Sequence, residues 1–319
     1  MQVKQSLSEE IRKRAKKVDD WIDRFFSLSS RELCDASTHL LGAGGKRLRP
    51  VTLLLSCESV GGDVKKVLPA AVSVELVHNF TLIHDDIMDE DEMRRGVKTV
   101  HTIYGAPIAI LAGDTLFSKA FEILPISKSS PDRVARSEYL LARACTEICE
   151  GQHFDMTFEK RENVTEAQYM EMVGKKTGAL YAASSAIGAL LGGGSSAEVN
   201  SFERFGRLAG TAFQIHDDVL GLTVPEKVLG KARGSDLLRG KKTLIFIHAK
   251  KRGFDAKCKS EGEVEKAISK LHELGSIEYA RSKALSMIEQ GKNCLRNVRA
   301  SNAKQTLLEL ADFMVNRGY

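Results

Sequence analysis

The residues best suited to chemistry begin with a short acidic run at residues 84–92, His-Asp-Asp-Ile-Met-Asp-Glu-Asp-Glu. On a helix, Asp85 and Asp89 are four residues apart and project from the same face. Two carboxylates placed in this way repel each other unless a cation lies between them, and aspartate oxygens suit hard divalent ions such as Mg²⁺. The spacing therefore predicts a divalent metal site at a helix end. The alternative for such a run is a solvated acidic helix end.

The neighbours of this acidic run favour the metal site. The preceding residues 77–84 are largely apolar, so the run lies at the end of a buried segment. Arg94 and Arg95 follow it, and the planar guanidinium group binds phosphate oxygens in a forked geometry. Together these features predict a phosphorylated substrate held next to the metal.

A second acidic pair, Asp217 and Asp218, also ends an apolar segment. Lys231, Asp236 and the segment 240–243, Gly-Lys-Lys-Thr, follow it. Two aspartate clusters, each trailed by basic residues, predict two walls of one pocket. Carboxylates would hold metal ions, the ions would hold a diphosphate, and lysine and arginine would neutralise the remaining charge. Taken alone, the second pair is as compatible with a solvated helix end.

Two basic segments contain glycines. Residues 44–50 read Gly-Gly-Lys-Arg-Leu-Arg-Pro, and residues 174–178 read Gly-Lys-Lys-Thr-Gly. Glycine allows the backbone to approach a ligand closely, but the spacing of a P-loop is missing from residues 44–50. Each segment alone could be a basic surface turn.

The elements that position these residues are expected to be helices. Apolar residues recur at intervals of three and four, as in residues 68–78 and 307–314, and no proline occurs between Pro131 and Pro225. No linker rich in proline, glycine or serine divides the chain. The pattern predicts one all-α domain over residues 1–319, a bundle of roughly ten or more helices.

Composition narrows the functional classes. The 319 residues are 43% apolar and 28% charged, which excludes a disordered chain. The net charge of +5, from 47 basic and 42 acidic residues, does not argue for nucleic-acid binding. The six cysteines form no CxxC pair, which fits a reducing cytoplasm. The uncharged stretch 177–197 is rich in glycine and serine, so we expect a buried helix and a loop, and no transmembrane segment.

A different reaction class has to be weighed against this prediction. Residues 75–78 and 150–153 both read Glu-x-x-His, and two such motifs on facing helices are typical of a di-iron carboxylate bundle. The motif is short enough to recur by chance in a helical protein. The di-iron hypothesis also leaves both aspartate clusters and the basic segments unexplained.

In their order along the chain, these segments resemble the trans-type isoprenyl diphosphate synthases, most closely archaeal-type geranylgeranyl diphosphate synthases. The resemblance runs from about residue 30 to the C-terminus. The matching residues are Gly44 to Pro50, His78, Asp85-Asp86-x-x-Asp89, Arg94-Arg95-Gly96, Gly151-Gln152-x-x-Asp155, Lys176-Thr177, Gln214, Asp217-Asp218 and Gly240-Lys241-Lys242-Thr243.

The resemblance implies a homodimeric all-α enzyme, a single helical bundle with a central cavity, that condenses isopentenyl diphosphate with an allylic diphosphate. By position, the isopentenyl diphosphate ligands would be Lys46, Arg49, His78 and Arg95. The residues facing the allylic diphosphate would be Arg94, Lys176, Thr177, Gln214, Lys231 and Lys241. The ligands of Mg²⁺, usually three ions, would be Asp85, Asp89 and Asp217. The groups closest to the chemistry would then be Asp85, Asp89, Lys176 and Asp217.

The implied reaction agrees with the physical chemistry of these groups. Cleavage of the allylic C–O bond leaves a carbocation and a diphosphate anion, and preorganised positive charge stabilises the leaving group. The cation must be kept from water, so we expect an apolar cavity below the aspartates. The oxygens of Thr177 and Gln214 would help to stabilise the cation.

One position departs from the family pattern. The second motif is commonly DDxxD, but Gly221 stands where the third aspartate would be. The second wall then offers one carboxylate on that face, supplemented by Asp218 or, through water, by Asp236. We expect activity to survive with a weaker metal site. A noncatalytic subunit of a heteromeric synthase is the alternative that Gly221 leaves open.

Product length is expected to depend on the helix that carries Asp85. Phe80 lies five residues before Asp85 and Thr81 four before it. A single bulky aromatic residue at the fifth position, with no insertion in the first DDxxD, resembles the enzymes that make geranylgeranyl diphosphate. The resemblance therefore implies a C20 product, with C15 farnesyl diphosphate as the alternative. Phe80 could also be an ordinary core residue.

Overall fold

The structure is a computed structural model that describes residues 2–225, 233–258 and 260–316. The chain groups into two compact units, which are described separately here. The first unit comprises residues 1–142, 183–202 and 298–307, and the second comprises residues 143–182, 203–297 and 308–319. Helices dominate both units, which confirms the all-α prediction. That residues 1–319 form a single domain remains a prediction.

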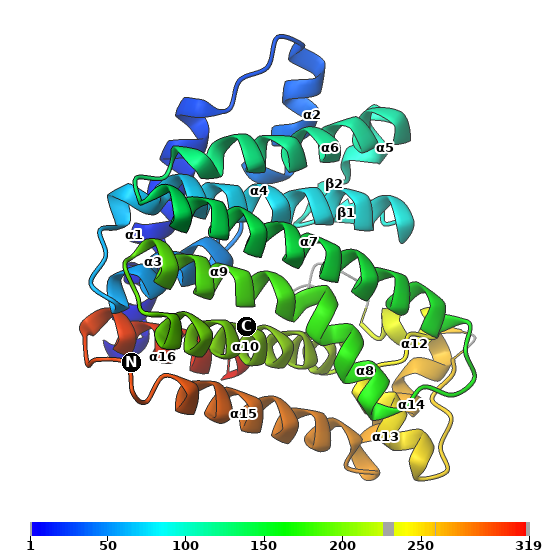
Figure 1. The fold of residues 1–319 in the computed structure, drawn as a ribbon. Helices are drawn as coiled ribbons and strands as arrows, with labels where there is room; N and C mark the ends of the chain where they lie inside the picture. Colours follow the sequence, from blue (N-terminus) through cyan, green and yellow to red (C-terminus); the bar gives the residue numbers. More distant parts are fainter. Residues whose placement is uncertain (1, 226–232, 259, 317–319) are drawn as a thin grey trace. The chain divides into compact units, whose positions relative to one another are not determined.

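The first unit contains the N-terminal helices (Figure 1). Its elements are α1 (Gln2–Phe25), α2 (Arg31–Gly42), α3 (Leu48–Ser59), α4 (Val64–Met88), β1 (Met93–Arg94), β2 (Val97–Lys98), α5 (Val100–Tyr104), α6 (Ala106–Ile123) and the 3₁₀ turn η1 (Leu124–Ile126). Four helices contribute residues to both units. They are α7 (Pro131–Glu159), α9 (Ala179–Leu191), α10 (Ser196–Thr223) and α16 (Asn302–Asn316).

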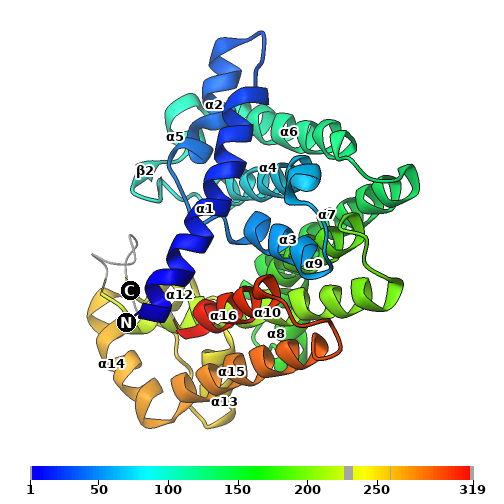
Figure 2. The same cartoon turned by 90° about the vertical axis from the view of Figure 1, so that its left-hand side faces the viewer.

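Helix α4 forms the core of the first unit. Residues 69–77 are all buried, and a helix that is buried on every side lies inside a domain. Helices α3 and α6 pack against it, and α1 crosses beside it (Figure 2). The helix begins at Asp63, whose side chain caps it by accepting a hydrogen bond from the backbone N–H of Lys65. Its other end delivers the first aspartate cluster.

The uncharged stretch 177–197 forms the buried helix and loop expected from its small residues. Helix α9 packs on α3 so closely that a Cβ atom at Gly188 would lie 2.1 Å from the carbonyl oxygen of Leu53. In the loop after α9, a Cβ atom at Gly192 would lie 2.9 Å from the carbonyl oxygen of Cys57. Small residues therefore set the distance between these two segments.

A short β-hairpin interrupts the helices of the first unit. Strands β1 and β2 pair in antiparallel fashion, and their turn consists of Arg95 and Gly96. Both turn residues have positive φ angles, 52° for Arg95 and 79° for Gly96, as a two-residue turn with the twist of a hairpin requires. The sequence pattern did not predict this hairpin. It presents Arg94 and Arg95 beside the end of α4.

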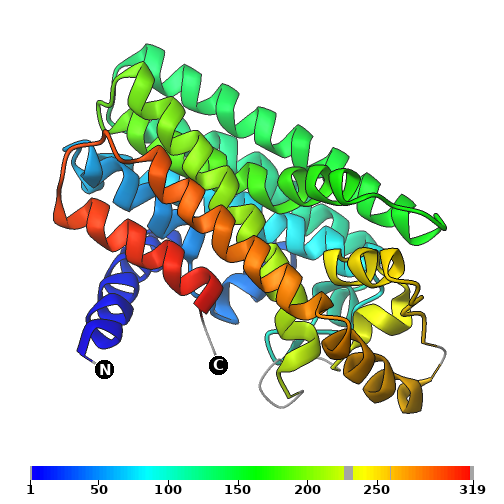
Figure 3. The same ribbon diagram turned by 90° about the horizontal axis from the view of Figure 1, so that it is seen from below.

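The second unit contains the remaining elements. They are α8 (Glu166–Val173), the π-helical turn η2 (Gly174–Gly178), α12 (Ser235–Arg239), α13 (Leu244–Lys251), α14 (Glu261–Glu273) and α15 (Ser276–Cys294). Helix α15 runs beside α10 (Figure 3), and a Cβ atom at Gly291 would lie 3.6 Å from the side chains of Leu208 and Phe205.

Glycines bring the start of α9 onto α10. A Cβ atom at Gly178 would lie 2.8 Å from Thr211 Oγ1, and one at Gly210 would lie 2.7 Å from the ring of Tyr181. Larger residues at either position would push the two segments apart. The close packing brings Thr177 beside the residues that precede the second aspartate pair.

One helix among the described residues, α4, is long and apolar enough to cross a membrane, and 67% of its apolar window is buried inside the protein. Core helices share these properties with membrane helices. The stretch 177–197 that the sequence singled out is not this helix.

Candidate active site

The first aspartate cluster lies on the last turn of α4. The helix ends at Met88, and the backbone N–H of Asp89 donates to the carbonyl oxygen of Asp85 at 2.8 Å. Asp85 and Asp89 therefore have the predicted i, i+4 relation. Both are half-buried, whereas Asp86 between them is fully buried. The turn thus presents two carboxylates on one side and one to the interior.

Arg94 joins the hairpin to this cluster. Its Nε atom donates to Asp86 Oδ1, and its Nη2 atom lies 3.9 Å from Asp85 Oδ2 and 3.8 Å from Asp91 Oδ2. Burial raises the pKa of Asp86 to about 6, against the lowering effect of the Arg94 guanidinium. Asp86 is therefore an interior anchor for Arg94, and Asp85 and Asp89 are better placed to bind an ion.

Helix α6 fixes the end of α4 through Gly113. The imidazole of His84 lies where a side chain at residue 113 would be, because a Cβ atom there would come within 2.2 Å of His84 Nε2. The same nitrogen lies 3.2 Å from the carbonyl oxygen of Ile110. This contact holds the turn just before the aspartates.

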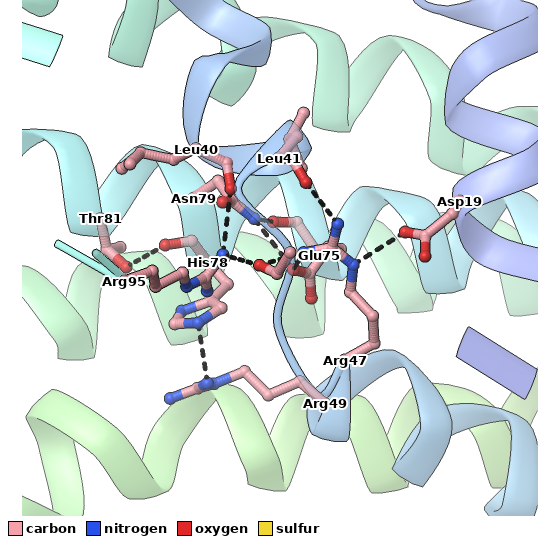
Figure 4. A network of polar contacts seen from close by, with 11 residues as sticks. Asp19, Leu40, Leu41, Arg47, Arg49, Glu75, His78, Asn79, Thr81 and Arg95 are labelled. Carbon is pink, nitrogen blue, oxygen red and sulfur yellow. Dashed lines mark hydrogen bonds and ion pairs between the residues drawn. The ribbon is translucent and has the colours of Figure 1, made fainter. Parts of the chain in front are cut away.

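The basic segment 44–50 folds against α4 (Figure 4). Arg49 Nη1 lies 3.2 Å from His78 Nε2, and Arg95 Nη1 donates to the carbonyl oxygen of Leu40 at 3.0 Å. The Arg95 guanidinium lies over Gly45, where a Cβ atom would be 3.2 Å from it. The predicted residues Arg49, His78 and Arg95 are therefore brought together. Lys46, on the same segment, is exposed.

His78 is held as a neutral imidazole. Burial lowers its pKa well below the ordinary value, and the positive charges of Arg49 and Arg95 lower it further. A neutral ring nitrogen facing Arg49 accepts a hydrogen bond rather than adding another charge.

Aromatic side chains line α4 and α6 one turn above the aspartates. The ring centroid of Phe80 lies 5.2 Å from that of Phe117 and 4.8 Å from that of His84. The ring centroid of Phe117 lies 5.1 Å from that of Phe121. Phe80 is therefore one member of an aromatic row, and Thr81 beside it donates its hydroxyl to the carbonyl oxygen of His78 at 2.7 Å.

In the second unit, Asp155 is shared by two lysines. Lys176 Nζ lies 2.6 Å and Lys241 Nζ 4.0 Å from Asp155 Oδ2. Burial acts to raise the pKa of Asp155, but the two ammonium groups bring it below its ordinary value. Asp155 stays ionised and holds both lysines together. The sequence motif contained Asp155, but we assigned it no role.

Local structure explains how Lys176 reaches Asp155. Lys176 and Thr177 lie on the π-helical turn η2, a distortion that is frequent at functional sites. Gly151 on α7 faces this turn, and a Cβ atom there would lie 2.2 Å from the backbone nitrogen of Lys176. Since Asp155 is one turn after Gly151, the glycine is what allows Asp155 and Lys176 to meet.

A chain of hydrogen bonds runs through the second aspartate pair. Thr177 Oγ1 donates to Gln214 Oε1 at 3.1 Å, and Gln214 Nε2 donates to Asp218 Oδ1 at 3.0 Å. Tyr169 donates its hydroxyl to Asp218 Oδ2 at 2.7 Å. Burial raises the pKa of Asp218 to about 7, helped by the negative charge of Asp236. Asp218 is thus engaged within the protein, and Asp217 is the pair's candidate ligand.

Asp236 lies beside Gly221, the position of the missing third aspartate. A Cβ atom at Gly221 would lie 3.7 Å from Asp236 Oδ2. The backbone N–H of Gly234 donates to the carbonyl oxygen of Gly221 at 2.9 Å, which holds the start of α12 against α10. Of the two supplements considered from the sequence, Asp236 is the one near this face. Lys231, another predicted site residue, lies outside the described residues.

A cavity of about 350 Å³ in the second unit has Asp236 and Lys241 in its wall. Lys242, Phe246 and Lys250 line other parts of it. Several basic side chains, Lys241 among them, therefore line this cavity.

The two Glu-x-x-His motifs are engaged with cations. Glu75 Oε1 lies 2.9 Å from Arg47 Nη1, and Glu150 Oε2 lies 3.0 Å from Lys175 Nζ. Within residues that the structure describes, no group of three or more His, Cys, Asp and Glu side chains is arranged to hold a metal ion. The motifs give no support to a di-iron centre. Mg²⁺ differs from such centres because it often takes only one or two carboxylates and completes its shell with water and substrate phosphates.

Known proteins resemble this chain over almost its whole length. A geranylgeranyl diphosphate synthase of Methanosarcina mazei is 51% identical, and the match covers 98% of this chain and 99% of the relative. A geranylfarnesyl diphosphate synthase of Natronomonas pharaonis is 46% identical, with 90% of each chain covered.

Solved structures of related proteins also resemble this chain. A geranylgeranyl pyrophosphate synthetase of Geoglobus acetivorans has a TM-score of 0.91 and 48% identity, with 96% of this chain and 99% of that chain covered. A polyprenyl synthase of Caulobacter crescentus, solved with calcium and isoprenyl diphosphate, has a TM-score of 0.89 and 29% identity, covering 97% and 98%. The family model described as polyprenyl synthetase matches residues 30–279. This chain therefore belongs to the polyprenyl synthetase family and is a prenyltransferase.

Proposed function

We propose that this chain condenses isopentenyl diphosphate with allylic diphosphates to an all-trans C20 product, geranylgeranyl diphosphate. The observation that carries the proposal is the pair of lysines, Lys176 and Lys241, that one half-buried carboxylate, Asp155, holds within 4.0 Å. Two preorganised ammonium groups suit a diphosphate leaving group. The Methanosarcina mazei relative, 51% identical, carries the name of this activity.

Divalent ions fit the aspartates of this chain. Asp85, Asp89 and Asp217 offer only carboxylate oxygens, the donors that Mg²⁺ prefers. Three ions are expected, with Asp236 supplementing the second wall near Gly221. Bound Mg²⁺ would neutralise negative charge on the diphosphate. The Caulobacter crescentus relative was solved with calcium, another hard divalent ion.

The chain's own residues divide between two substrates. Lys46, Arg49, His78 and Arg95 are assigned to isopentenyl diphosphate, and the neutral imidazole of His78 keeps the Arg49 guanidinium oriented. The residues assigned to the allylic diphosphate are Arg94, Lys176, Thr177, Gln214, Lys231 and Lys241. Cations bound to each diphosphate offset its negative charge, so the two substrates can lie close together.

The reaction follows from these positions. The allylic C–O bond breaks, and the bonding electrons leave with the diphosphate, which Lys176 and Lys241 stabilise. The double bond of isopentenyl diphosphate then attacks the allylic cation and forms the new C–C bond. A proton is lost to the released diphosphate. Thr177 is buried, and its oxygen and that of Gln214, 3.1 Å apart, supply negative partial charge near the cation without admitting water.

The aromatic row supports the C20 assignment. Phe80 and Phe117, whose centroids are 5.2 Å apart, form a bulky barrier near the first aspartate cluster. A chain that grows along α4 would stop at this barrier. The relative from Natronomonas pharaonis is named for a C25 product. The position of the barrier therefore decides between products that differ by one five-carbon unit.

The active form is proposed to be a homodimer in the cytoplasm. Ile103, Ile110 and Leu111 are apolar side chains of α5 and α6 that are 46%, 46% and 51% exposed in the single chain. Apolar residues grouped on one surface favour a protein partner. All six cysteines are free thiols, as a reducing compartment requires.

Incubation with isopentenyl diphosphate, each allylic primer and Mg²⁺, followed by product sizing, tests the proposal. We expect C20 as the longest main product from C5, C10 and C15 primers. A main product of C15 or C25 would contradict the length assignment. No incorporation from any primer would contradict the activity and would favour a noncatalytic subunit.

A further inference from the structure

Arg47 lies between the proposed substrate ligands Lys46 and Arg49, but its side chain is turned into the protein (Figure 4). The side chain is 4% exposed. Its Nε atom donates to Asp19 Oδ1 at 2.8 Å, its Nη1 atom to Glu75 Oε1 at 2.9 Å, and its Nη2 atom to the carbonyl oxygen of Leu41 at 2.7 Å. Arg47 is therefore engaged within the protein on every guanidinium nitrogen and is not placed as a substrate ligand.

The backbone of Arg47 adopts an unfavourable conformation, which the contacts of its side chain stabilise. Its φ angle is 47°, in the left-handed region, which is unfavourable for a residue with a Cβ atom. The residue directly precedes α3, so this conformation sets the angle at which the helix begins. Since Lys46 lies before this bend and Arg49 in the first turn after it, the bend decides how the two are oriented.

Glu75 is the buried end of this network. Its side chain is 2% exposed, and Oε1 also accepts a hydrogen bond from Asn79 Nδ2 at 3.0 Å. Burying a carboxylate costs free energy unless it is paired with a cation. Glu75 and Arg47 therefore each stabilise the charged form of the other. The negative charge of Glu75 also favours the charged form of Arg95, whose pKa burial lowers. The Glu75 carboxylate thus stabilises the charged forms of Arg47 on the basic segment and of Arg95 on the hairpin.

We propose that Glu75 is a positioning residue for isopentenyl diphosphate. Together with Asp19 on α1, it holds Arg47 in its left-handed conformation and thereby directs Lys46 and Arg49 at the substrate's diphosphate. The inference rests on the proposed function, because it concerns one of the two substrates. It also gives α1, outside the motifs of the family, a part in substrate binding.

Steady-state kinetics with each substrate varied in turn tests this role. Glu75→Ala removes the buried carboxylate that accepts from Arg47 Nη1. We expect KM for isopentenyl diphosphate to rise at least about tenfold, with KM for the allylic diphosphate within about twofold of wild type. Glu75→Gln keeps an acceptor oxygen for Arg47, so it should restore much of the lost affinity. A role in stability alone would not separate the two KM values.

A double variant guards against simple unfolding, because Glu75→Ala removes one of the two carboxylates that pair with the buried guanidinium of Arg47. Arg47→Met combined with Glu75→Leu replaces the buried ion pair by apolar groups, a change that often preserves stability. We expect this variant to keep a cooperative thermal transition and still to show the raised KM for isopentenyl diphosphate.

Glu58→Gln is the matched control. Glu58 on α3 forms an ion pair with Arg14 on α1 at 2.7 Å, so it links the same two helices outside the network. The KM values of Glu58→Gln for both substrates should match those of wild type. Unchanged KM for isopentenyl diphosphate in both Glu75→Ala and the double variant, or an equal rise in both KM values, would overturn the inference. Wild-type protein that does not consume isopentenyl diphosphate would overturn the proposed function as well.

Discussion

At the residue scale, the site's charges are arranged in advance of the substrate. Lys176 and Lys241 share Asp155, Arg94 is anchored by Asp86, and His78 stays neutral beside Arg49. Each contact orients a group that we assign to substrate binding or to the reaction. Substitutions at single residues should therefore affect chemistry more than folding.

Asp85→Asn should lower turnover by orders of magnitude, because it weakens a metal ligand without changing the size of the side chain. The thermal transition should shift little, since Asp85 is half-buried. Incorporation of labelled isopentenyl diphosphate measures the effect. Glu92→Gln, an exposed acid of the same run, is the control and should remain active. Near-normal incorporation by Asp85→Asn would refute the ligand assignment.

His78 should make stability depend on pH. In the folded protein its pKa lies well below 6.5, so the folded state binds fewer protons than the unfolded state. Its contribution is therefore present above pH 6.5 and is lost as the pH falls below that value. We expect wild type to lose about 1 kcal/mol more stability than His78→Gln between about pH 7.5 and about pH 5.5.

Thermal or denaturant unfolding of both proteins across this range checks the pH effect of His78. His272→Gln on α14 is the control, because that imidazole is exposed. Parallel stability curves for wild type and His78→Gln would contradict a His78 whose pKa is lowered in the folded protein.

At the element scale, glycines and one irregular turn determine how helices meet. Gly151 permits α7 to contact η2, Gly113 permits His84 to lie on α6, and Gly188 permits α9 to lie on α3. The contacts of Gly151 and Gly113 lie beside Lys176 and His84, next to residues of the proposed site. Changes in them should therefore affect both stability and substrate affinity.

Gly151→Ala should separate α7 from η2. The new Cβ atom would lie 2.2 Å from the backbone nitrogen of Lys176, so one of the two elements has to move. Overpacking of this kind costs about 1–3 kcal/mol, and KM for the allylic diphosphate should rise. Denaturant unfolding and kinetics check both effects. Gly262→Ala on α14 meets no atom within 4 Å and should be neutral or slightly stabilising.

Phe80→Ala should lengthen the product beyond C20, because it opens the aromatic row between α4 and α6. Chromatographic sizing of products from a C15 primer measures the change. Phe25→Ala, a 53% exposed ring on α1, is the control. An unchanged product distribution for Phe80→Ala would show that this ring is only part of the core.

Local sequence patterns predicted that the chain is helical, but they did not predict the hairpin or several contacts within each unit. The i, i+4 spacing of Asp85 and Asp89 predicted their common face. Asp236 was one of two supplements considered for the face at Gly221, and the sequence alone could not choose between them. The pair of Glu75 with Arg47 was not predicted, because it joins segments separated in sequence. The hairpin at Arg95 was missed for another reason: its strands are two residues each, too short for a periodic pattern.

At the scale of the whole molecule, a prenyltransferase has to bring two anionic substrates together and keep water away from a cation. The first unit carries Asp85 and Asp89, and the second carries Asp217, Lys176 and Lys241. Sequence order and family membership predict that both aspartate clusters serve one diphosphate. The mild net charge of +5 gives no argument for a surface that binds nucleic acid.

Binding of farnesyl thiodiphosphate, whose C–S bond resists cleavage, in the presence of Mg²⁺ tests this claim most directly. Calorimetric titration should give one saturable site that requires Mg²⁺. Asp85→Asn and Asp217→Asn should each weaken binding at least about tenfold, because both clusters hold the same diphosphate. Wild-type affinity in either variant would contradict the account, since it would mean that one aspartate cluster alone holds the ligand.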